Sequence, residues 1–359
     1  MKNNDIVTLQ SIYEGRAPHR LHWTLGKFDP YQLPGPQAFH LADDGRRVFG
    51  NGNSRNQEKP FASRGAPWLT IDYAKARFAH AREGDVDHFR WETPQGRLTA
   101  RRHSNHMIEF PLKSVDDLPR WQYVQENLVY RKNPEFTEEQ GRKCWSVSWK
   151  WSPVQEMLQF ETGVENFYYF LMDAPDRMRA LLDTMHRKNL EGIAIGLNAC
   201  PKATVLMLTE NTSSQIISPD YYRDLTLPHV RKYVEMAHAR TMKCVVHMCG
   251  SLTALFDEFE ATGMDGIHSV TPPPVGDTEY MAARERFGDD FIILGRFSAQ
   301  LFINRDREAI RETLCAMIPE RLIHTPFALQ ASTDEMQPGE ADIQDLVNAL
   351  QDLQADFNP

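Results

Sequence analysis

Several features that would define other classes of protein are missing from this sequence. No stretch of about 18 apolar residues occurs, so a membrane-spanning helix is not expected, and the polar opening "MKNNDIVTLQ" is unlike a secretory signal. No long run of lysine and arginine is present and the formal net charge is -9, which argues against nucleic acid and membrane surfaces as partners. Neither a GxGxxG nor a GxxxxGK[ST] loop follows any predicted strand, which argues against nucleotide binding.

Cysteine is also scarce, with five residues in a chain of 359. A small, odd number of cysteines argues against a disulfide framework, so we expect a protein of the reducing cytoplasm. The remaining composition, 41% hydrophobic and 25% charged, is ordinary for a globular protein. At this length one α/β barrel can account for most of the chain.

The first 140 residues differ from the rest, because they are rich in turn residues and only weakly periodic. Residues 88–112 read as two extended runs around a turn at 94–96, which predicts a β-hairpin. Ser114 with the acidic residues after it is typical of a helix N-terminus. We interpret residues 1–140 as an N-terminal elaboration that covers one end of the main domain.

From residue 144 onward, short apolar runs alternate with helical segments. Near-continuous apolar strands between helices are typical of a parallel sheet that is buried on both faces. This rhythm predicts an α/β fold, a (β/α)8 TIM barrel with its core in residues 141–359 and a single catalytic domain overall. The predicted strands are residues 144–149, 203–208, 244–249, 266–270, 291–295 and 327–331.

Polar residues follow the predicted strands, at the end of a barrel where active sites lie. We predict catalytic roles for three of them, and substrate contacts for three further residues. Trp149 belongs to a group of tryptophans, with Trp145 and Trp151, that we otherwise assign to the core. The predicted catalytic residues are Glu210, Asp277 and His268, and the predicted substrate-binding residues are Asn211, Arg296 and Trp149.

His247 and Cys249 form the most specific pattern, because alternate residues at a strand end point to the same side. Imidazole and thiolate are the ligands that Zn²⁺ prefers. A catalytic zinc site needs a third protein ligand, and Asp334 and Glu210 are the best-placed carboxylates. We predict His247, Cys249 and Asp334 as metal ligands; the alternative is a buried His and Cys that bond to their neighbours.

Residues 218–277, "SPDYYRDLTLPHVRKY" through "HSVTPPPVGD", resemble the uroporphyrinogen decarboxylase superfamily, and more specifically its zinc-dependent, corrinoid-linked methyltransferases. Residues 93–127 and the segment "EGRAPHR" also fit that branch. The resemblance implies a (β/α)8 barrel in which His247 and Cys249 bind zinc. The chain lacks the arginine-rich N-terminal segment that grips porphyrinogen carboxylates, so porphyrinogen decarboxylation is not expected.

The resembled methyltransferases take their third zinc ligand from a cysteine after the last barrel strand, where this chain has Thr333. Either a neighbouring carboxylate such as Asp334 completes the site, or metal binding is weakened or lost. A carboxylate donates less charge than a thiolate, which would favour a Lewis-acid role for the ion over thiol activation.

The activity that the resemblance implies is methyl transfer between a small methylated substrate or thiol and a corrinoid. No DxHxxG motif is present, so the corrinoid (cobalamin) is expected to arrive free or on a partner protein; a homodimer is left open. One alternative is a metal-independent decarboxylase or lyase in which Arg296, His268 and Asp334 hold a carboxylated substrate. The other is a non-catalytic tetrapyrrole-binding barrel.

Overall fold

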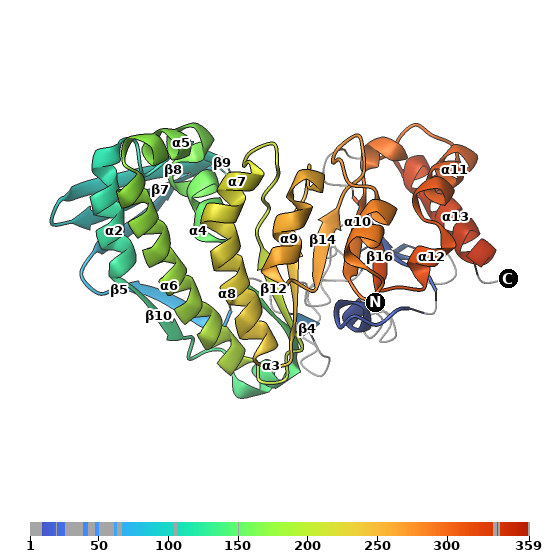
Figure 1. Cartoon of the computed structure of the whole chain (residues 1–359), viewed down its shortest axis with the longest axis horizontal. Helices are drawn as coiled ribbons and strands as arrows, with labels where there is room; N and C mark the ends of the chain where they lie inside the picture. The colour runs from blue at the N-terminus through green and yellow to red at the C-terminus, as the bar shows by residue number, and fades with distance from the viewer. Residues whose placement is uncertain are drawn as a thin grey trace.

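The computed structural model describes residues 9–18, 20–25, 39–41, 47–49, 61–62, 67–103, 106–149, 151–332, 336 and 338–357. Figure 1 shows a row of helices, among them α6, α8, α9 and α10, in front of a long sheet. A second, small sheet lies at one end of the molecule, beside α2 and α5, and α11 and α13 lie at the other end.

Within the described residues ten strands form the main sheet, in the order β3-β2-β1-β16-β15-β14-β13-β12-β11-β4. Seven consecutive strands from β1 to β11 are parallel and make a curled half-barrel; the two-residue β4 pairs in parallel with β11. The strands are β1 (His22–Leu25), β2 (Phe39–Leu41), β3 (Arg47–Phe49), β4 (Phe61–Ala62), β11 (Cys144–Trp149), β12 (Val205–Thr209), β13 (Lys243–His247), β14 (Gly266–Val270), β15 (Ile292–Phe297) and β16 (Phe327–Ala331).

The α/β class and the curled parallel sheet confirm part of the predicted TIM barrel. Each of the six strand ranges predicted from residue 144 onward overlaps a strand of this sheet. The predicted closure of the barrel is not observed. The edge of β1 that would pair with β4 in a closed barrel pairs instead with the antiparallel strand β2. Among the described residues no ladder joins β1 to β4, so the expected closed barrel is a half-barrel in this part of the chain.

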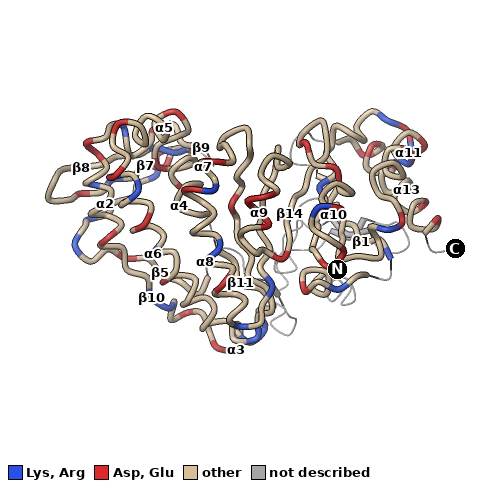
Figure 2. The backbone as a smooth tube through the Cα atoms, in the orientation of Figure 1, with Lys and Arg blue, Asp and Glu red and all other residues tan. Residues whose placement is uncertain are grey.

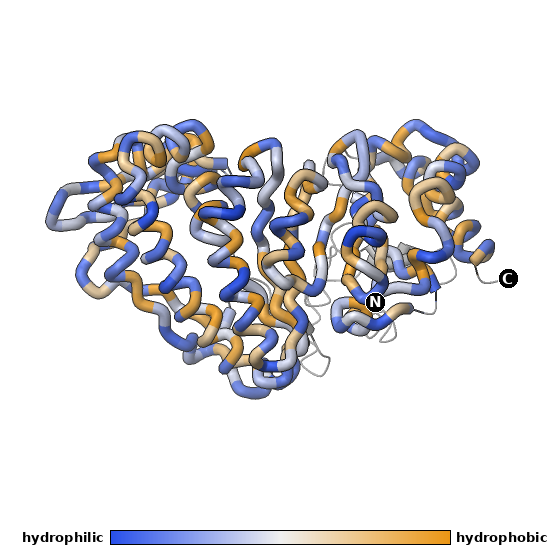
Figure 3. Tube along the Cα trace, in the orientation of Figure 1, coloured by the Kyte–Doolittle hydropathy of each residue, from blue (hydrophilic) through white to orange (hydrophobic). Residues whose placement is uncertain are grey.

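The helices cover the outer face of the sheet because the strands and helices both turn apolar side chains to the layer between them. Hydrophobic and hydrophilic residues alternate along α6 and α8 in Figure 3, as expected for helices with one buried side. The α-helices are α2 (Leu118–Glu126), α3 (Glu138–Lys143), α4 (Pro153–Glu156), α5 (Gly163–Asp173), α6 (Pro175–Ala199), α7 (Pro219–Tyr221), α8 (Leu227–His238), α9 (Phe256–Thr262), α10 (Tyr280–Phe287), α11 (Arg307–Met317), α12 (Glu320–Ile323) and α13 (Glu340–Phe357).

Shorter helical segments extend several of these helices. Two are π-helices, η2 (Met157–Glu161) after α4 and η3 (Tyr222–Thr226) before α8. The three remaining segments are 3-10 helices: η1 (Val115–Asp117), η4 (Thr253–Leu255) and η5 (Ala299–Leu301).

The inner face of the half-barrel holds a separate apolar cluster that includes Val205 and Met207 of β12, Val245 of β13, and Ile292 and Leu294 of β15. Three residues of the helical segment 9–13 join this cluster; they are Leu9, Ile12 and Tyr13, all buried. The N-terminal segment therefore fills the interior of the main sheet.

The predicted N-terminal elaboration needs a correction, because the main sheet draws strands from both sides of the boundary at residue 140. Strands β1 to β4 lie before residue 140 and belong to the main sheet. The part that does stand apart is a four-stranded antiparallel sheet with a two-stranded sheet and α2 beside it. Its strands are β6 (Arg77–Glu83), β7 (Val86–Thr93), β8 (Gly96–His103) and β9 (His106–Glu109), with β5 (Leu69–Tyr73) paired to β10 (Leu128–Lys132).

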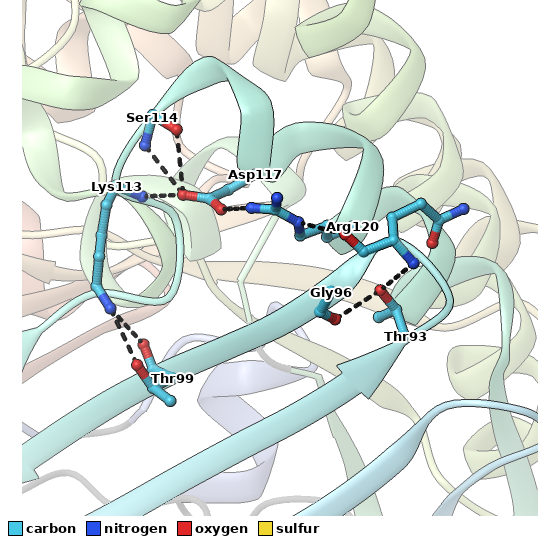
Figure 4. Close-up of polar contacts among 8 residues, drawn as sticks. Thr93, Gly96, Thr99, Lys113, Ser114, Asp117 and Arg120 are labelled. Carbon is cyan, nitrogen blue, oxygen red and sulfur yellow. Dashed lines mark hydrogen bonds and ion pairs between the residues drawn. The ribbon is translucent and has the colours of Figure 1, made fainter.

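The predicted hairpin is confirmed, since β7 and β8 pair up to Thr93 and Gly96 at the turn. Figure 4 shows how the start of α2 is fixed to this hairpin. The Asp117 carboxylate accepts hydrogen bonds from the backbone N–H groups of Lys113 (2.9 Å) and Ser114 (3.1 Å) and pairs with Arg120, which in turn donates to the Gln95 carbonyl. These bonds hold the small sheet against α2.

Charges on the molecule are mixed. Figure 2 shows acidic and basic residues interspersed along the helices, and Arg307 and Arg311 of α11 pair with Asp352 and Asp356 of α13. Within the described residues, no helix has both the length and the apolar character needed to cross a bilayer.

Candidate active site

Three neighbouring strands place polar residues at one level of the carboxyl edge of the sheet. Thr209 of β12 lies opposite His247 of β13, and His247 lies opposite His268 of β14. Inward-facing Val245 precedes His247 by two residues, so the strand period directs His247 to the inner face as well. The predicted convergence of strand-end residues is therefore present for these two histidines.

His247 and His268 contact each other directly. Their Nδ1 atoms are 2.6 Å apart, and the ring centroids are 4.8 Å apart. One Nδ1 must carry the proton and the other must accept it, because two acceptors or two donors would repel at this distance. His268 is buried, and the ring of Tyr13 stacks on it with 6.4 Å between the ring centroids.

Cys249 lies two residues beyond β13 and is half-buried. Its thiol donates to the Asn211 side-chain carbonyl, with 2.8 Å between Sγ and Oδ1. The backbone N–H groups of Glu210 and Asn211 both donate to the His247 carbonyl, at 3.0 and 2.8 Å. The loop after β12 is thus fixed to the end of β13, which holds Asn211 beside the thiol in a left-handed conformation at φ 51°.

Glu210 is buried and has both carboxylate oxygens occupied. Ser152 donates to it twice, from its backbone N–H (2.8 Å) and its hydroxyl (2.7 Å), and Thr212 donates from its hydroxyl (2.9 Å). Burial raises the pKa of Glu210 to about 7, although the three hydrogen bonds act in the opposite direction. The carboxylate therefore links the loop after β11 to the loop after β12, and near neutral pH it can hold or release a proton.

Arg296, at the end of β15, donates to the Ser332 hydroxyl just after β16, with 2.9 Å between Nη2 and Oγ. By register it is paired with Gln330 of β16. The guanidinium therefore lies at the same edge of the sheet as the histidine pair. The predicted metal ligand Asp334 lies outside the described residues, together with Thr333 and Glu335.

Two predicted site residues have other positions. The Asp277 carboxylate accepts from the backbone N–H groups of Leu252 (2.7 Å) and Thr253 (3.3 Å), so it caps the start of η4 instead of facing the histidines. Trp149 lies opposite Leu208, which faces outward. The Trp149 ring packs against α6 so closely that a Cβ atom at Gly192 would lie 2.0 Å from it. Trp149 is thus part of the sheet–helix core.

The donor chemistry fits zinc only in part. His247 and Cys249 are a nitrogen and a sulfur donor at one strand end, as zinc sites require. Among the described residues, however, no three His, Cys, Asp or Glu side chains are grouped closely enough to hold an ion. Zinc binding at this site therefore requires at least one further ligand besides His247 and Cys249.

Ser152 is the site residue that the sequence reasoning missed. The pair Ser152–Pro153 is typical of a helix start, and Ser152 does accept from the Gln155 N–H at 3.3 Å as the cap of α4. Nothing in the sequence indicates that its hydroxyl also meets a carboxylate 58 positions away.

A curled parallel sheet with polar groups at its carboxyl edge defines a barrel-type α/β protein with a site at the strand ends. Residues 151–329 match the family model for uroporphyrinogen decarboxylase (URO-D). The match supports the uroporphyrinogen decarboxylase superfamily, and the matched segment includes Glu210, His247, Cys249, His268 and Arg296.

Three solved structures are similar in part. A methyltransferase from Methanosarcina mazei is 17% identical with a TM-score of 0.44, over 68% of this chain and 64% of that one, so the chain spans slightly less than two thirds of that protein. A B12-independent methionine synthase from Shewanella sp. W3-18-1 is 10% identical, with a TM-score of 0.36 over 79% and 75% of the two chains. A type I 3-dehydroquinate dehydratase from Clostridium difficile is 15% identical, with a TM-score of 0.24 over 58% and 82%. No curated protein gives a significant match.

Proposed function

We propose that this protein is a zinc-dependent methyltransferase that moves a methyl group between a small methylated substrate or thiol and a corrinoid. The observation that carries the proposal is the position of His247 at the end of β13 and of Cys249 two residues beyond it, within the segment that matches the uroporphyrinogen decarboxylase family model. In the proposed site these two residues and Asp334 hold the ion, and the corrinoid arrives free or on a partner protein.

When bound, zinc would supply positive charge that lowers the pKa of a thiol or draws electrons from a leaving group. The residues around it have separate tasks. Asn211 positions the Cys249 side chain by accepting from its protonated thiol, a bond that is released when the thiol ionises to bind the ion. Glu210 holds or releases a proton beside the strand ends, and Arg296 offers a positive charge to an anionic part of the substrate.

Metal analysis tests the zinc site. Protein purified without chelators is expected to contain about one zinc per chain. The variant Cys249→Ser should lose most of it, whereas Cys315→Ser, which alters an exposed cysteine on α11, should keep it. Zinc absent from the wild-type protein, or retained in full by Cys249→Ser, would contradict the proposal.

Methyl transfer is tested by mixing the zinc-loaded protein with reduced cobalamin and single methylated ethers, amines or thioethers. Formation of methylcobalamin is followed by its visible absorption. The expected result is formation with at least one of these donors and a large loss in Cys249→Ser. Transfer to a free thiol from methylcobalamin, with none from any donor to cobalamin, would assign the opposite direction of the reaction.

One observation favours a second candidate, a metal-independent decarboxylase or lyase. Arg296 carries a guanidinium at the carboxyl edge, beside Ser332, where it can bind a substrate carboxylate. For this candidate, Arg296→Gln should raise the KM for a carboxylated substrate, and activity should persist after dialysis against a chelator.

A further inference from the structure

A cavity of about 520 Å³ lies between the small sheet and the loop that follows β11. One wall carries aromatic rings of the small sheet and its neighbour β5: Tyr73, Phe78, Phe89 and Trp91. The facing wall carries Trp151 and Phe160. None of the predicted site residues lines this cavity, although Trp151 belongs to the tryptophan group that the sequence reasoning singled out.

The rings of the small-sheet wall contact one another, so the wall is a continuous aromatic surface. Phe78 lies 5.5 Å from Tyr73 and 5.4 Å from Trp91, measured between centroids, and Phe89 lies 6.1 Å from Trp91. The Trp91 indole N–H donates to the Tyr73 hydroxyl at 3.3 Å. The bonds around Asp117 in Figure 4 hold this sheet against α2, so the wall is in place before any ligand binds.

The facing wall includes residues of the π-helix η2. A π-helical turn is uncommon and frequently lies at functional sites. It places Phe160 against Trp151, with the ring centroids 4.5 Å apart, and it puts Glu161 at the same cavity. The Leu112 N–H donates to the Glu161 carbonyl, which fixes the end of the turn.

Two carboxyl groups, Glu156 and Glu161, also line the cavity. Glu161 is only 7% exposed, and burial together with the nearby Glu156 raises its pKa well above the ordinary value. The cation among the described lining residues is Arg102, which is paired with Asp87 at 3.0 Å and lies 5.1 Å above the Phe89 ring. Because Arg102 is already paired with Asp87, a cation in the cavity would stabilise the ionised form of the buried Glu161 carboxyl group.

We infer that this cavity binds a small organic cation with N-methyl groups, such as a quaternary ammonium compound. Aromatic faces attract such a cation and cover its methyl groups, while Glu156 and Glu161 balance its charge. A bare metal ion suits the cavity less well, because six of its thirteen lining residues are aromatic and the faces of their rings offer no ligand atoms. The inference goes beyond the proposed methyl transfer and requires neither zinc nor a corrinoid.

Calorimetric titration with choline and with its neutral carbon analogue, 3,3-dimethylbutan-1-ol, tests the inference. The two ligands have the same shape and differ in charge. Choline is expected to bind about 10-fold or more tightly than the alcohol, given the strength of a desolvated cation–π contact. Equal affinity for choline and the alcohol would show that the cavity is an apolar pocket without preference for a cation. Either that result or no binding of either ligand would overturn the inference.

Variants separate the two parts of the site. Glu161→Gln keeps the shape of the side chain and should lower choline affinity with little effect on the alcohol. Phe89→Leu, at a half-buried ring, should also lower choline affinity, whereas Glu165→Gln, at an exposed carboxylate of α5, should change nothing. Unchanged choline binding in both Glu161→Gln and Phe89→Leu would contradict the inference.

Proton release gives an independent readout. A bound cation favours ionised Glu161, so choline should release protons from a cavity whose other titratable lining groups are Tyr73, Arg102 and Glu156. Titrations in two buffers of different ionisation enthalpy measure this release. The neutral alcohol should release none, and equal proton release by both ligands would contradict the assignment.

Discussion

Ser152 shows how one hydroxyl serves two purposes, since it caps α4 and donates to the buried Glu210. Ser218 offers a matched comparison: it also precedes a proline and caps a helix, by accepting from the Tyr221 N–H. We predict that Ser218→Ala lowers the free energy of unfolding by about 1 kcal/mol, the usual value of a cap. Ser152→Ala should cost about 2 to 3 kcal/mol, because a hydrogen bond to a carboxylate is lost as well.

Urea unfolding of the two variants measures this difference. Equal costs for both serines would mean that the Ser152 hydroxyl contributes nothing through Glu210. A Thr212→Val variant, which removes the third donor without changing a helix cap, should fall between the wild-type protein and Ser152→Ala.

At the residue scale, the sequence predicted correctly where strand-end residues meet. It did not predict which face of a strand a side chain occupies or which groups a loop residue contacts. His247 and His268 were found because strand ends in a parallel sheet meet at one edge, and they lie in contact. Trp149 was misplaced because a strand of six consecutive buried residues gives no alternation from which to tell inner from outer face. Asp277 looked catalytic by position, whereas its partners, the N–H groups of η4, depend on how a loop turns back.

At the scale of helices, α6 and α8 contact each other through a pair of imidazoles. His186 and His229 stack with centroids 4.3 Å apart, and burial, with a smaller effect from His186, lowers the pKa of His229 to about 3. An imidazole that stays neutral in the folded chain but takes up a proton in the unfolded chain costs stability at low pH. This contribution is absent above pH 6.5, the ordinary pKa, and grows as the pH falls toward 3.

We therefore predict that the wild-type protein loses about 2 kcal/mol through this group between pH 6.5 and pH 5. His229→Phe keeps a ring in the stack and should make the decline shallower by that amount in urea unfolding at both pH values. His324→Gln, at an exposed histidine, should leave the slope unchanged. A parallel decline in wild type and His229→Phe would show that His229 is not the group responsible.

The elements themselves were largely predictable. The six strands from residue 144 onward could be found because parallel strands buried on both faces give continuous apolar runs, and β11, β14 and β16 match the predicted ranges. The strands before residue 67 could not be found in this way. They are two to four residues long, too short for a period to be visible. They join the main sheet because β1 pairs with β16 and β4 with β11, while β2 and β3 follow β1.

At the scale of the whole molecule, the N-terminal segment is a structural part of the half-barrel and not a cover on one end. Ile12 and Tyr13 are fully buried among inward-facing residues of β12, β13 and β15, and Tyr13 reaches the ring of His268. Glu14 then accepts from the Thr204 hydroxyl at 2.6 Å, which ties the segment to the start of β12. The interior of the sheet and the floor of the candidate site thus depend on residues nearly 200 positions away in sequence.

This arrangement predicts that a small change near the N-terminus weakens the whole fold. Ile12→Ala should lower the free energy of unfolding by about 2 to 5 kcal/mol, because it leaves a cavity in the buried cluster on the inner face of the sheet. Ile71→Ala, at an isoleucine that is 57% exposed on β5, should change it by no more than about 0.5 kcal/mol. Urea unfolding followed by tryptophan fluorescence measures both. If Ile12→Ala were as mild as Ile71→Ala, the segment would be a removable cover, and the boundary at residue 140 would describe the molecule after all.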